Sequence, residues 1–370
     1  MRLGINGWRL AGTRTGVGRY LSSLIRHWHA GASRVFSEMT LYTASALPEE
    51  TVVPDGLRVR VLGPPMRLIA WENLRLGPTA RDDVLFCPSY TRPIVVRGRP
   101  VVATHDAVYC VHPELFPVSQ RWFYTPAYRW SARHAALVIA DTEAVKADIV
   151  RFFGVDAGRV RVTYLAPAEC FRPLGDGAAR GRVRVRGLQL DEPFFLSVGK
   201  MTGRRRPLVM IEAFAGLVQR TRLPHHLVIV GPRAAGAAAE ARAAQLGIGA
   251  RVHLAGFLDD EDVNRLYNAA DALVMPSMYE TGSLPVVEAQ AAGLPVVCVR
   301  NPGMSEITGD AARFFDELTP EALTGAMIEL AEDDELRASL RTRGLENVRR
   351  FSWARCAADT MTVLEEAAAR

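Results

Sequence analysis

The chain has 370 residues, which is long enough for two domains that each bury their own core. Hydrophobic residues make up 49% of the sequence and charged residues 23%, a balance typical of a globular protein and not of a disordered one. No apolar run approaches the ~18 residues that a membrane-spanning helix needs, and residues 1–10 lack the apolar core of a signal peptide.

The net charge is +5, and only Lys146 and Lys200 among the 45 lysines and arginines are lysines. This surplus permits contact with an anionic membrane face or a polyanionic substrate but requires neither. No basic run is interleaved with aromatic residues, so we expect no nucleic-acid partner. The five cysteines form no C-x-x-C pair and the eight histidines show no ligand spacing, which argues against disulfides and metal sites and favours a reducing cytoplasm.

Apolar runs alternate with helical patterns over residues 1–168, which predicts a doubly wound α/β domain. The expected strands are Leu3–Gly7, Met39–Thr43, Arg58–Leu62, Val84–Cys87, Val101–Thr104, Leu137–Ala140 and Val160–Val162. Gly16 and Gly18 follow the first strand and precede a helical stretch at 19–28. A glycine loop that opens a helix can bring N–H groups close to an anion or a sugar, although two glycines fit an ordinary loop equally well.

His105 and Asp106 directly follow an expected strand, where side chains of α/β domains reach a ligand crevice. Histidine can hydrogen-bond a hydroxyl group and titrates near neutrality. A lone His-Asp pair is more often structural than catalytic, so position alone does not decide its role. Further along, Asp141 or Thr142 is expected to cap the next helix.

Residues 169–192 contain glycines, arginines and few large apolar side chains, and we predict that they form a linker. It is either an interdomain hinge or an ordinary surface loop. A second alternation follows and predicts a Rossmann-like domain over 193–350, helical from about Pro320. Its expected strands are Phe194–Val198, His226–Val230, Val252–Ala255, Ala272–Met275 and Pro295–Val299, and its expected helices are Pro207–Gln219, Ala234–Leu246, Asp260–Ala269 and Pro285–Ala292.

The first strand of this second domain ends at Gly199, and Lys200, Arg204, Arg205 and Arg206 follow within a short loop. When a sugar leaves a nucleotide, negative charge grows on the diphosphate. Fixed cations at that spot stabilise the transition state more than the ground state. The alternative is a solvated arginine cluster.

Two glutamates, Glu280 and Glu288, are separated by seven residues and bracket the turn into the helix expected at 285–292. Carboxylates accept hydrogen bonds from hydroxyl groups, and a helix N-terminus attracts phosphate. A ligand that combines hydroxyl groups with phosphate is a nucleotide sugar. Surface glutamates on an ordinary connection fit the spacing equally well.

The stretch from Glu280 to Glu288 resembles the signature of the family-4 retaining glycosyltransferases, and the resemblance, strongest in 194–316, covers nearly the whole chain. It implies the GT-B fold, in which two Rossmann-like doubly wound domains face a cleft. It also implies that residues 351–370 form a C-terminal helix that packs back on the N-terminal domain.

The resemblance assigns roles in the donor site of the C-terminal domain. Glu288 would hold the ribose, Glu280 the sugar, and Lys200 and Arg205 the diphosphate, with Arg204 or Arg206 replacing Arg205 if the register shifts by one. The other expected donor-binding residues are Gly199, Arg204, Gly231, Gly256, Phe257, Thr281, Gly282, Ser283 and Leu284. The family usually has Gly-Phe-Gly where this chain has Thr281, Gly282 and Ser283, which leaves the donor sugar open.

In the N-terminal domain, the resemblance places His105 near the donor sugar and implies that Gly16 and Gly18 form a ligand-binding loop that faces the interdomain cleft. It implies transfer of a hexose from a UDP or GDP sugar to a hydroxyl acceptor such as a glycan, a lipid-linked glycan or a natural product. Retention would follow from front-face attack without a metal. A nucleotide-sugar epimerase or phosphorylase, or a non-catalytic partner subunit, are the alternatives on the same fold. We expect a cytoplasmic protein, for which peripheral contact with the inner membrane face is permitted.

Overall fold

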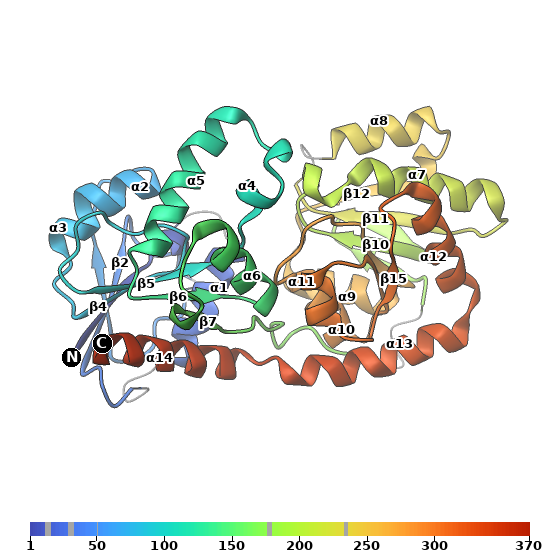
Figure 1. The fold of residues 1–370 in the computed structure, drawn as a ribbon. Helices are drawn as coiled ribbons and strands as arrows, with labels where there is room; N and C mark the ends of the chain where they lie inside the picture. Colours follow the sequence, from blue (N-terminus) through green and yellow to red (C-terminus); the bar gives the residue numbers. More distant parts are fainter. Residues whose placement is uncertain (12–15, 29–32, 50, 176–179, 233–235) are drawn as a thin grey trace. The chain divides into compact units, whose positions relative to one another are not determined.

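The computed structural model describes residues 1–11, 16–28, 33–49, 51–175, 180–232 and 236–370. The chain forms two compact units. Unit 1 comprises Met1–Leu165 together with Phe351–Arg370, and unit 2 comprises Ala166–Arg350. Each unit is built on its own parallel sheet, with helices on both faces (Figure 1).

The sheet of unit 1 has seven parallel strands in the order β3-β2-β1-β4-β5-β6-β7. They are β1 (Arg2–Asn6), β2 (Glu38–Thr43), β3 (Leu57–Val61), β4 (Val84–Cys87), β5 (Arg99–Thr104), β6 (Leu137–Ala140) and β7 (Val160–Val162). The central strands are almost wholly buried, as expected where helices cover both faces. The strand order reverses between β1 and β4, so a topological switch point lies at their carboxyl ends.

The helices of unit 1 lie on both faces of this sheet. They are α1 (Gly16–His27), α2 (Leu68–Trp71), α3 (Gly77–Thr79), α4 (Val108–Val111), α5 (Val118–Arg133), α6 (Glu143–Asp148) and α14 (Trp353–Ala369). On one face α1 and α14 pack together, and Trp28 at the end of α1 donates Nε1–H to the carbonyl of Ala357 at 3.0 Å. On the other face Trp71 and Val145 belong to one apolar cluster with Val102 of β5.

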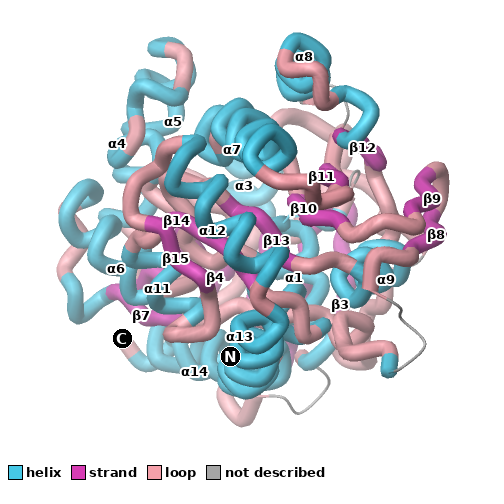
Figure 2. The backbone as a smooth tube through the Cα atoms, turned by 90° about the vertical axis from the view of Figure 1, so that its right-hand side faces the viewer, coloured by secondary structure: helices cyan, strands magenta, loops and turns pink. Residues whose placement is uncertain are grey.

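The sheet of unit 2 has six parallel strands in the order β12-β11-β10-β13-β14-β15. They are β10 (Phe194–Val198), β11 (His226–Val230), β12 (Val252–Gly256), β13 (Ala272–Met275), β14 (Val296–Val299) and β15 (Arg313–Phe315). The switch point lies between β10 and β13. A separate antiparallel hairpin, β8 (Val183–Val185) and β9 (Leu188–Leu190), lies beside α9 (Figure 2).

The helices of unit 2 also divide between the two faces. They are α7 (Pro207–Arg220), α8 (Ala237–Gln245), α9 (Asp260–Ala269), α10 (Leu284–Ala292), α11 (Pro302–Thr308), α12 (Pro320–Glu332) and α13 (Asp334–Asn347). Phe214 of α7 and Met327 of α12 pack with Phe195 of β10 in the apolar core of one face. Among the described residues, no helix is long and apolar enough to cross a membrane.

The predicted doubly wound fold is confirmed, and every expected strand is present with its ends within two residues of the prediction. The three-residue strands β8, β9 and β15 were not predicted, because a run so short carries little periodicity. The predicted glycine loop is wrong at Gly16 and Gly18, which form the first turn of α1 because the helix begins earlier than expected. Within 169–192, expected as a linker, the chain forms the β8–β9 hairpin and belongs with unit 2 from Ala166 onward.

Candidate functional site

The switch point of unit 2 brings together two loops that are far apart in the sequence. One loop follows β10 and carries Arg204 and Arg205, and the other follows β13 and carries Met278 and Glu280. The backbone N–H of Met278 donates to the carbonyl of Arg204 at 3.0 Å. Arg205 Nε donates to Glu280 Oε1 at 3.2 Å. The two segments predicted to bind one ligand are therefore in direct contact.

Glu280 is buried and held on several sides. Ser277 Oγ donates to Glu280 Oε1 at 3.0 Å, and Arg204 Nη2 lies 3.8 Å from Oε2. Burial alone would raise the pKa of Glu280, but the charges of Arg204 and Arg205 and the hydrogen bonds from Ser277 and Arg205 lower it below its usual value. Glu280 is therefore an ionised carboxylate, which can only accept hydrogen bonds.

The cations of this loop differ in exposure. Arg205 is largely buried, and its Nη1 donates to the carbonyl of Val198 at 2.6 Å. Its guanidinium lies against the backbone of Gly199, where φ is +118° and a Cβ atom would overlap Arg205 Nη1. Lys200 is exposed at the same edge, and Arg206 has a left-handed backbone at the start of α7. The loop therefore contains an exposed lysine, Lys200, and a largely buried arginine, Arg205, that hydrogen-bonds Glu280.

The ends of β10, β11 and β12 lie side by side through their glycines. Gly199 N–H donates to the carbonyl of Val230 at 2.8 Å, and Gly231 N–H donates to the carbonyl of Gly256 at 2.9 Å. A Cβ atom at Gly231 would overlap the carbonyl of Gly199, so only glycine fits this close approach. Phe257 follows directly and is 72% exposed. The carboxyl edge of the sheet therefore presents backbone without side chains at its glycines, next to the exposed aromatic ring of Phe257.

Helix α10 begins at Leu284 behind Ser283, whose side chain does not cap it. Ser283 is buried, and its Oγ has no hydrogen-bond partner among the described residues. Pro285 has no N–H, and the N–H groups of Val286 and Val287 donate to the carbonyl of Ser283, so the positive end of the helix and the buried hydroxyl group are what this turn offers to an anionic ligand. Glu288, one turn further on, is buried and accepts a hydrogen bond from Tyr267 Oη at 3.3 Å.

The backbone at Glu280, Thr281 and Gly282 is backed by α11. A Cβ atom at Gly303 would overlap the carbonyl of Glu280, so α11 can approach this turn only with glycine at that position. Thr281 is buried and Gly282 is half-buried. Residues 281–283, which stand where the family usually has Gly-Phe-Gly, thus form a packed segment before the N-terminus of α10.

In unit 1, His105 follows β5 and is also buried. Its Nδ1 lies 2.9 Å from Asp141 Oδ2, and its Nε2 lies 2.9 Å from the carbonyl oxygen of Pro88. Burial lowers the pKa of His105, but the charge of Asp141, its hydrogen bond and the Pro88 carbonyl outweigh burial and raise the pKa above its usual value. Because both neighbouring atoms are acceptors, the geometry favours a ring with both nitrogens protonated.

The carboxylate that holds His105 comes from the end of β6, and the adjacent Asp106 has other partners. Asp106 Oδ2 accepts from Tyr90 Oη at 2.9 Å, and its Oδ1 accepts from the N–H of Val108 at 3.1 Å. Thr142, and not Asp141, caps α6 by accepting from a backbone N–H. The capping residue left open by the sequence is thereby identified.

A buried glutamate that the sequence analysis did not single out lies at the same edge of unit 1. Glu72 begins a π-helical turn (Glu72–Leu76) and accepts a hydrogen bond at 2.9 Å from Asn6 Nδ2 at the end of β1. Burial raises the pKa of Glu72 to about 8, although hydrogen bonds from Thr91 and Asn6 and the charge of Arg9 lower it. This carboxyl group is largely protonated at neutral pH.

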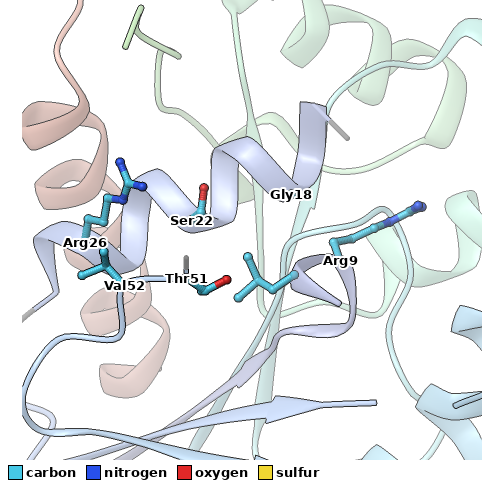
Figure 3. A pocket seen from close by; sticks show the side chains of 7 residues that line it. Arg9, Gly18, Ser22, Arg26, Thr51 and Val52 are labelled. Carbon is cyan, nitrogen blue, oxygen red and sulfur yellow. The ribbon is translucent and has the colours of Figure 1, made fainter. Parts of the chain in front are cut away.

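Gly18 lines a small, open hollow on the surface of unit 1. Figure 3 shows Arg9 and Arg26 at its two ends and Ser22 and Thr51 between them. This hollow runs along α1 from Gly18 in its first turn to Arg26 in its last turn. Its hydroxyl groups and arginines can hydrogen-bond a polar ligand.

Comparison with known proteins identifies the family. A model described as "Glycosyl transferases group 1" matches residues 183–347, and one described as "Glycosyl transferase 4-like domain" matches residues 15–166. The two ranges together span most of the chain. The chain belongs to the group 1 glycosyltransferases.

Relatives of this glycosyltransferase agree with that assignment. It is 26% identical to the O-antigen chain mannosyltransferase B of Escherichia coli, over 94% of this chain and 95% of the relative. It is 30% identical to a D-inositol 3-phosphate glycosyltransferase of Corynebacterium glutamicum, over 64% of this chain and 58% of the relative.

Two solved structures show the same fold. Sucrose-phosphate synthase from Thermosynechococcus elongatus has a TM-score of 0.76 at 20% identity, and the match covers 99% of this chain and 98% of that chain. Anabaena HepE in complex with UDP-glucose has a TM-score of 0.70 at 16% identity, and the match covers 100% and 98%. The glycosyltransferase therefore has the predicted GT-B fold.

The predicted donor-site residues of the glycosyltransferase gather at the carboxyl edge of the unit 2 sheet, and those of unit 1 lie on their own sheet edge. Sequence reasoning missed the side chains that hold the predicted ones in place. They are Ser277 and Tyr267 in unit 2 and Asp141 in unit 1, the last proposed only as a cap. Within the residues described, no group of three or more His, Cys, Asp or Glu side chains could hold a metal ion.

Proposed function

We propose that this glycosyltransferase moves a hexose from a nucleoside-diphosphate sugar to a hydroxyl acceptor and retains the anomeric configuration. The observation that carries the proposal is the ionised, buried Glu280, fixed by Arg205 and Ser277 at the switch point of unit 2. A carboxylate in this place can accept hydrogen bonds from sugar hydroxyl groups, while exposed Lys200 and the start of α10 attract phosphate.

The proposed division of roles follows the contacts in unit 2. Glu288, fixed by Tyr267, would accept hydrogen bonds from the ribose hydroxyl groups. The bare backbone at Gly231 and Gly256 and the exposed ring of Phe257 would border the base. The Ser283 hydroxyl group, buried without a partner among the described residues, would hydrogen-bond the donor at the start of α10.

In the proposed reaction, the bond between the anomeric carbon and the β-phosphate oxygen breaks and takes its electron pair to the phosphate. The acceptor oxygen attacks the same face of the anomeric carbon, and its proton passes to the departing phosphate oxygen. Lys200 and the neighbouring arginines would stabilise the negative charge that grows on the diphosphate. We propose that these fixed cations replace a divalent metal.

The donor sugar is first sought among mannose nucleotides, because the E. coli relative aligned over nearly both whole chains is a mannosyltransferase. The acceptor would bind to unit 1, where His105 lies at the carboxyl edge of the sheet. All five cysteines are free, which supports a cytoplasmic location.

The test is turnover of a donor panel by the purified protein. UDP and GDP forms of glucose and mannose are mixed with host extracts, with and without a chelator, and the products are analysed by mass spectrometry and by NMR of the anomeric proton. We expect a glycoside with the donor's anomeric configuration, formed equally well with chelator. An inverted product, or a product formed only with added metal, would contradict the respective part of the proposal. Release of an altered nucleotide sugar without a glycoside would indicate an epimerase.

A further inference from the structure

Helix α5 (Val118–Arg133) turns large apolar side chains toward water. Val118 is 60% exposed, Trp122 77% and Phe123 57%, and Pro126 is exposed as well. Positions 118, 122 and 126 are one helical turn apart, and Phe123 lies beside them. These four residues, named here the α5 stripe, form one continuous face of the helix.

The opposite face of α5 carries the side chains that contact unit 1. Tyr128 stacks on Tyr90 with ring centroids 4.7 Å apart, and Tyr124 stacks on Tyr109 at 5.6 Å. Only Ser131 and Ala132, near the C-terminal end of the helix, are buried. In Figure 1 the N-terminal turns of α5 lie away from the strands of unit 1. The tyrosines face the protein and the more hydrophobic tryptophan and phenylalanine face water, the reverse of a surface helix of a globular protein.

The charges on α5 are all of one sign. The helix carries Arg121, Arg129 and Arg133 and no acidic residue. The nearest preceding carboxylate, Glu114, lies 3.0 Å from His112 Nδ1. Aromatic side chains with arginines on the same helix favour the boundary between lipid headgroups and acyl chains, and each basic group adds attraction to anionic lipid.

We propose that the α5 stripe docks unit 1 on an anionic phospholipid surface, with the rings of Trp122 and Phe123 inserted below the headgroups. The helix would lie in the interface and not cross the membrane, in agreement with its 16 residues and its three arginines. The inference does not depend on which sugar is transferred, because α5 belongs to unit 1 and contributes no residue to the proposed donor site of unit 2.

The test is co-sedimentation of the full chain with vesicles of phosphatidylglycerol and phosphatidylcholine in equal parts, and with vesicles of phosphatidylcholine alone. We expect binding to the anionic vesicles that weakens as salt is added. The double variant Trp122→Ala/Phe123→Ala should lose about a hundredfold in partition, roughly tenfold for each large side chain removed from the lipid. Its melting temperature should stay at the wild-type value, because both side chains are exposed in the free protein.

The matched control is Ile94→Ala/Val95→Ala, at two apolar residues of a loop of unit 1 that are 63% and 75% exposed. This pair should bind vesicles as the wild type does. Equal loss in both double variants, no loss in Trp122→Ala/Phe123→Ala, or equal binding to phosphatidylcholine alone would overturn the proposal. So would light scattering that shows a dimer which the Trp122→Ala/Phe123→Ala change dissociates, because the stripe would then be a contact between copies.

Discussion

Each unit buries a glutamate at the carboxyl edge of its sheet, and the two carboxyl groups differ in charge. Glu72 of unit 1 receives a hydrogen bond from the neutral amide of Asn6, and burial raises its pKa to about 8. Glu280 of unit 2 is equally withdrawn from water, but Arg204 and Arg205 lower its pKa. Burial therefore does not decide the charge of a carboxyl group; its neighbours do. Unit 2 is built to present a fixed negative charge, and unit 1 is not.

The largest effect is expected at the carboxyl edge of the unit 1 sheet, in the variant His105→Ala. We expect turnover at saturating donor to fall by roughly two to four orders of magnitude if the imidazole acts on the reacting groups. Affinity for UDP or GDP should not change, because unit 2 holds the nucleotide in our proposal. Turnover and melting temperature are measured together. Normal turnover with a lowered melting temperature would show that the ring only holds Asp141 and Pro88 in place.

The matching variant of unit 2 is Glu280→Gln, which keeps the shape of the side chain and removes its charge. We expect turnover to fall by roughly 10²–10³, because the preorganised carboxylate is lost. Ser277→Ala, which removes one hydrogen bond to the same carboxylate, should lower turnover less. Both are measured as turnover of the donor that the panel identifies. Wild-type turnover in Glu280→Gln would remove the functional difference between the two buried glutamates.

The cations of the loop after β10 can be tested one at a time. Lys200→Ala and Arg205→Ala should each lower turnover by roughly tenfold to a hundredfold and affect donor affinity less, because charge on the diphosphate grows as the bond breaks. Arg206→Ala is the control from the same loop. A silent Arg205→Ala beside an inactive Arg204→Ala or Arg206→Ala would show that the assignment is off by one position.

A third glutamate sharpens the comparison, since Glu288 is buried but held by a neutral hydroxyl group. Glu288→Ala should weaken nucleotide binding by roughly 1–3 kcal/mol, the cost of losing hydrogen bonds to a charged acceptor. Tyr267→Phe removes only the supporting contact and should have a smaller effect. Titration calorimetry with UDP and GDP measures both. An unchanged dissociation constant in Glu288→Ala would exclude this residue from the ribose site.

The last expected effect is on stability alone and concerns Glu72. Its pKa is raised in the folded state, so it favours folding fully below its unfolded pKa of about 4.5, and that contribution is lost as pH rises toward about 8. Glu72→Gln has no proton to lose. Relative to the wild type, the melting temperature of Glu72→Gln should therefore rise as the pH increases from the lower to the higher of these two values. Melting curves of both proteins across this range test the sign, and a constant difference would show that Glu72 does not titrate there.

The sheets were predictable because both faces of each central strand are covered, so β4, β6 and β13 are unbroken apolar runs. The gathering of the proposed donor-site residues at one place was predictable because parallel strands end at one edge of the sheet. The side chains that support them were not. Asp141 lies 36 residues from His105 in the sequence, so no local pattern links them. Asp141 and Thr142 could each cap α6, and only the fold shows that Asp141 contacts the His105 ring while Thr142 caps the helix.

Helix α5 shows another limit of sequence reasoning. Its apolar positions have helical spacing, which normally predicts the buried face. The tertiary contacts instead place Tyr124 and Tyr128 toward the protein and leave Trp122 exposed. Nothing in the local pattern distinguishes a stripe that faces a core from one that faces another surface.

Unit 1 is built from two separate stretches of the sequence, because it includes helix α14. This arrangement has a consequence for biosynthesis. Arg161 pairs with Glu366 at 2.7 Å, and Arg99 donates to the carbonyl of Ala368 at 3.1 Å. The part of unit 1 that is made early therefore depends on contacts with a helix that is made much later. As the chain leaves the ribosome, the core around Trp28 lacks its covering helix until α14 has been made. Unit 2 is continuous in sequence and can close during synthesis. Unit 1 can therefore complete its core only after unit 2 has been made, although N-terminal domains generally fold first.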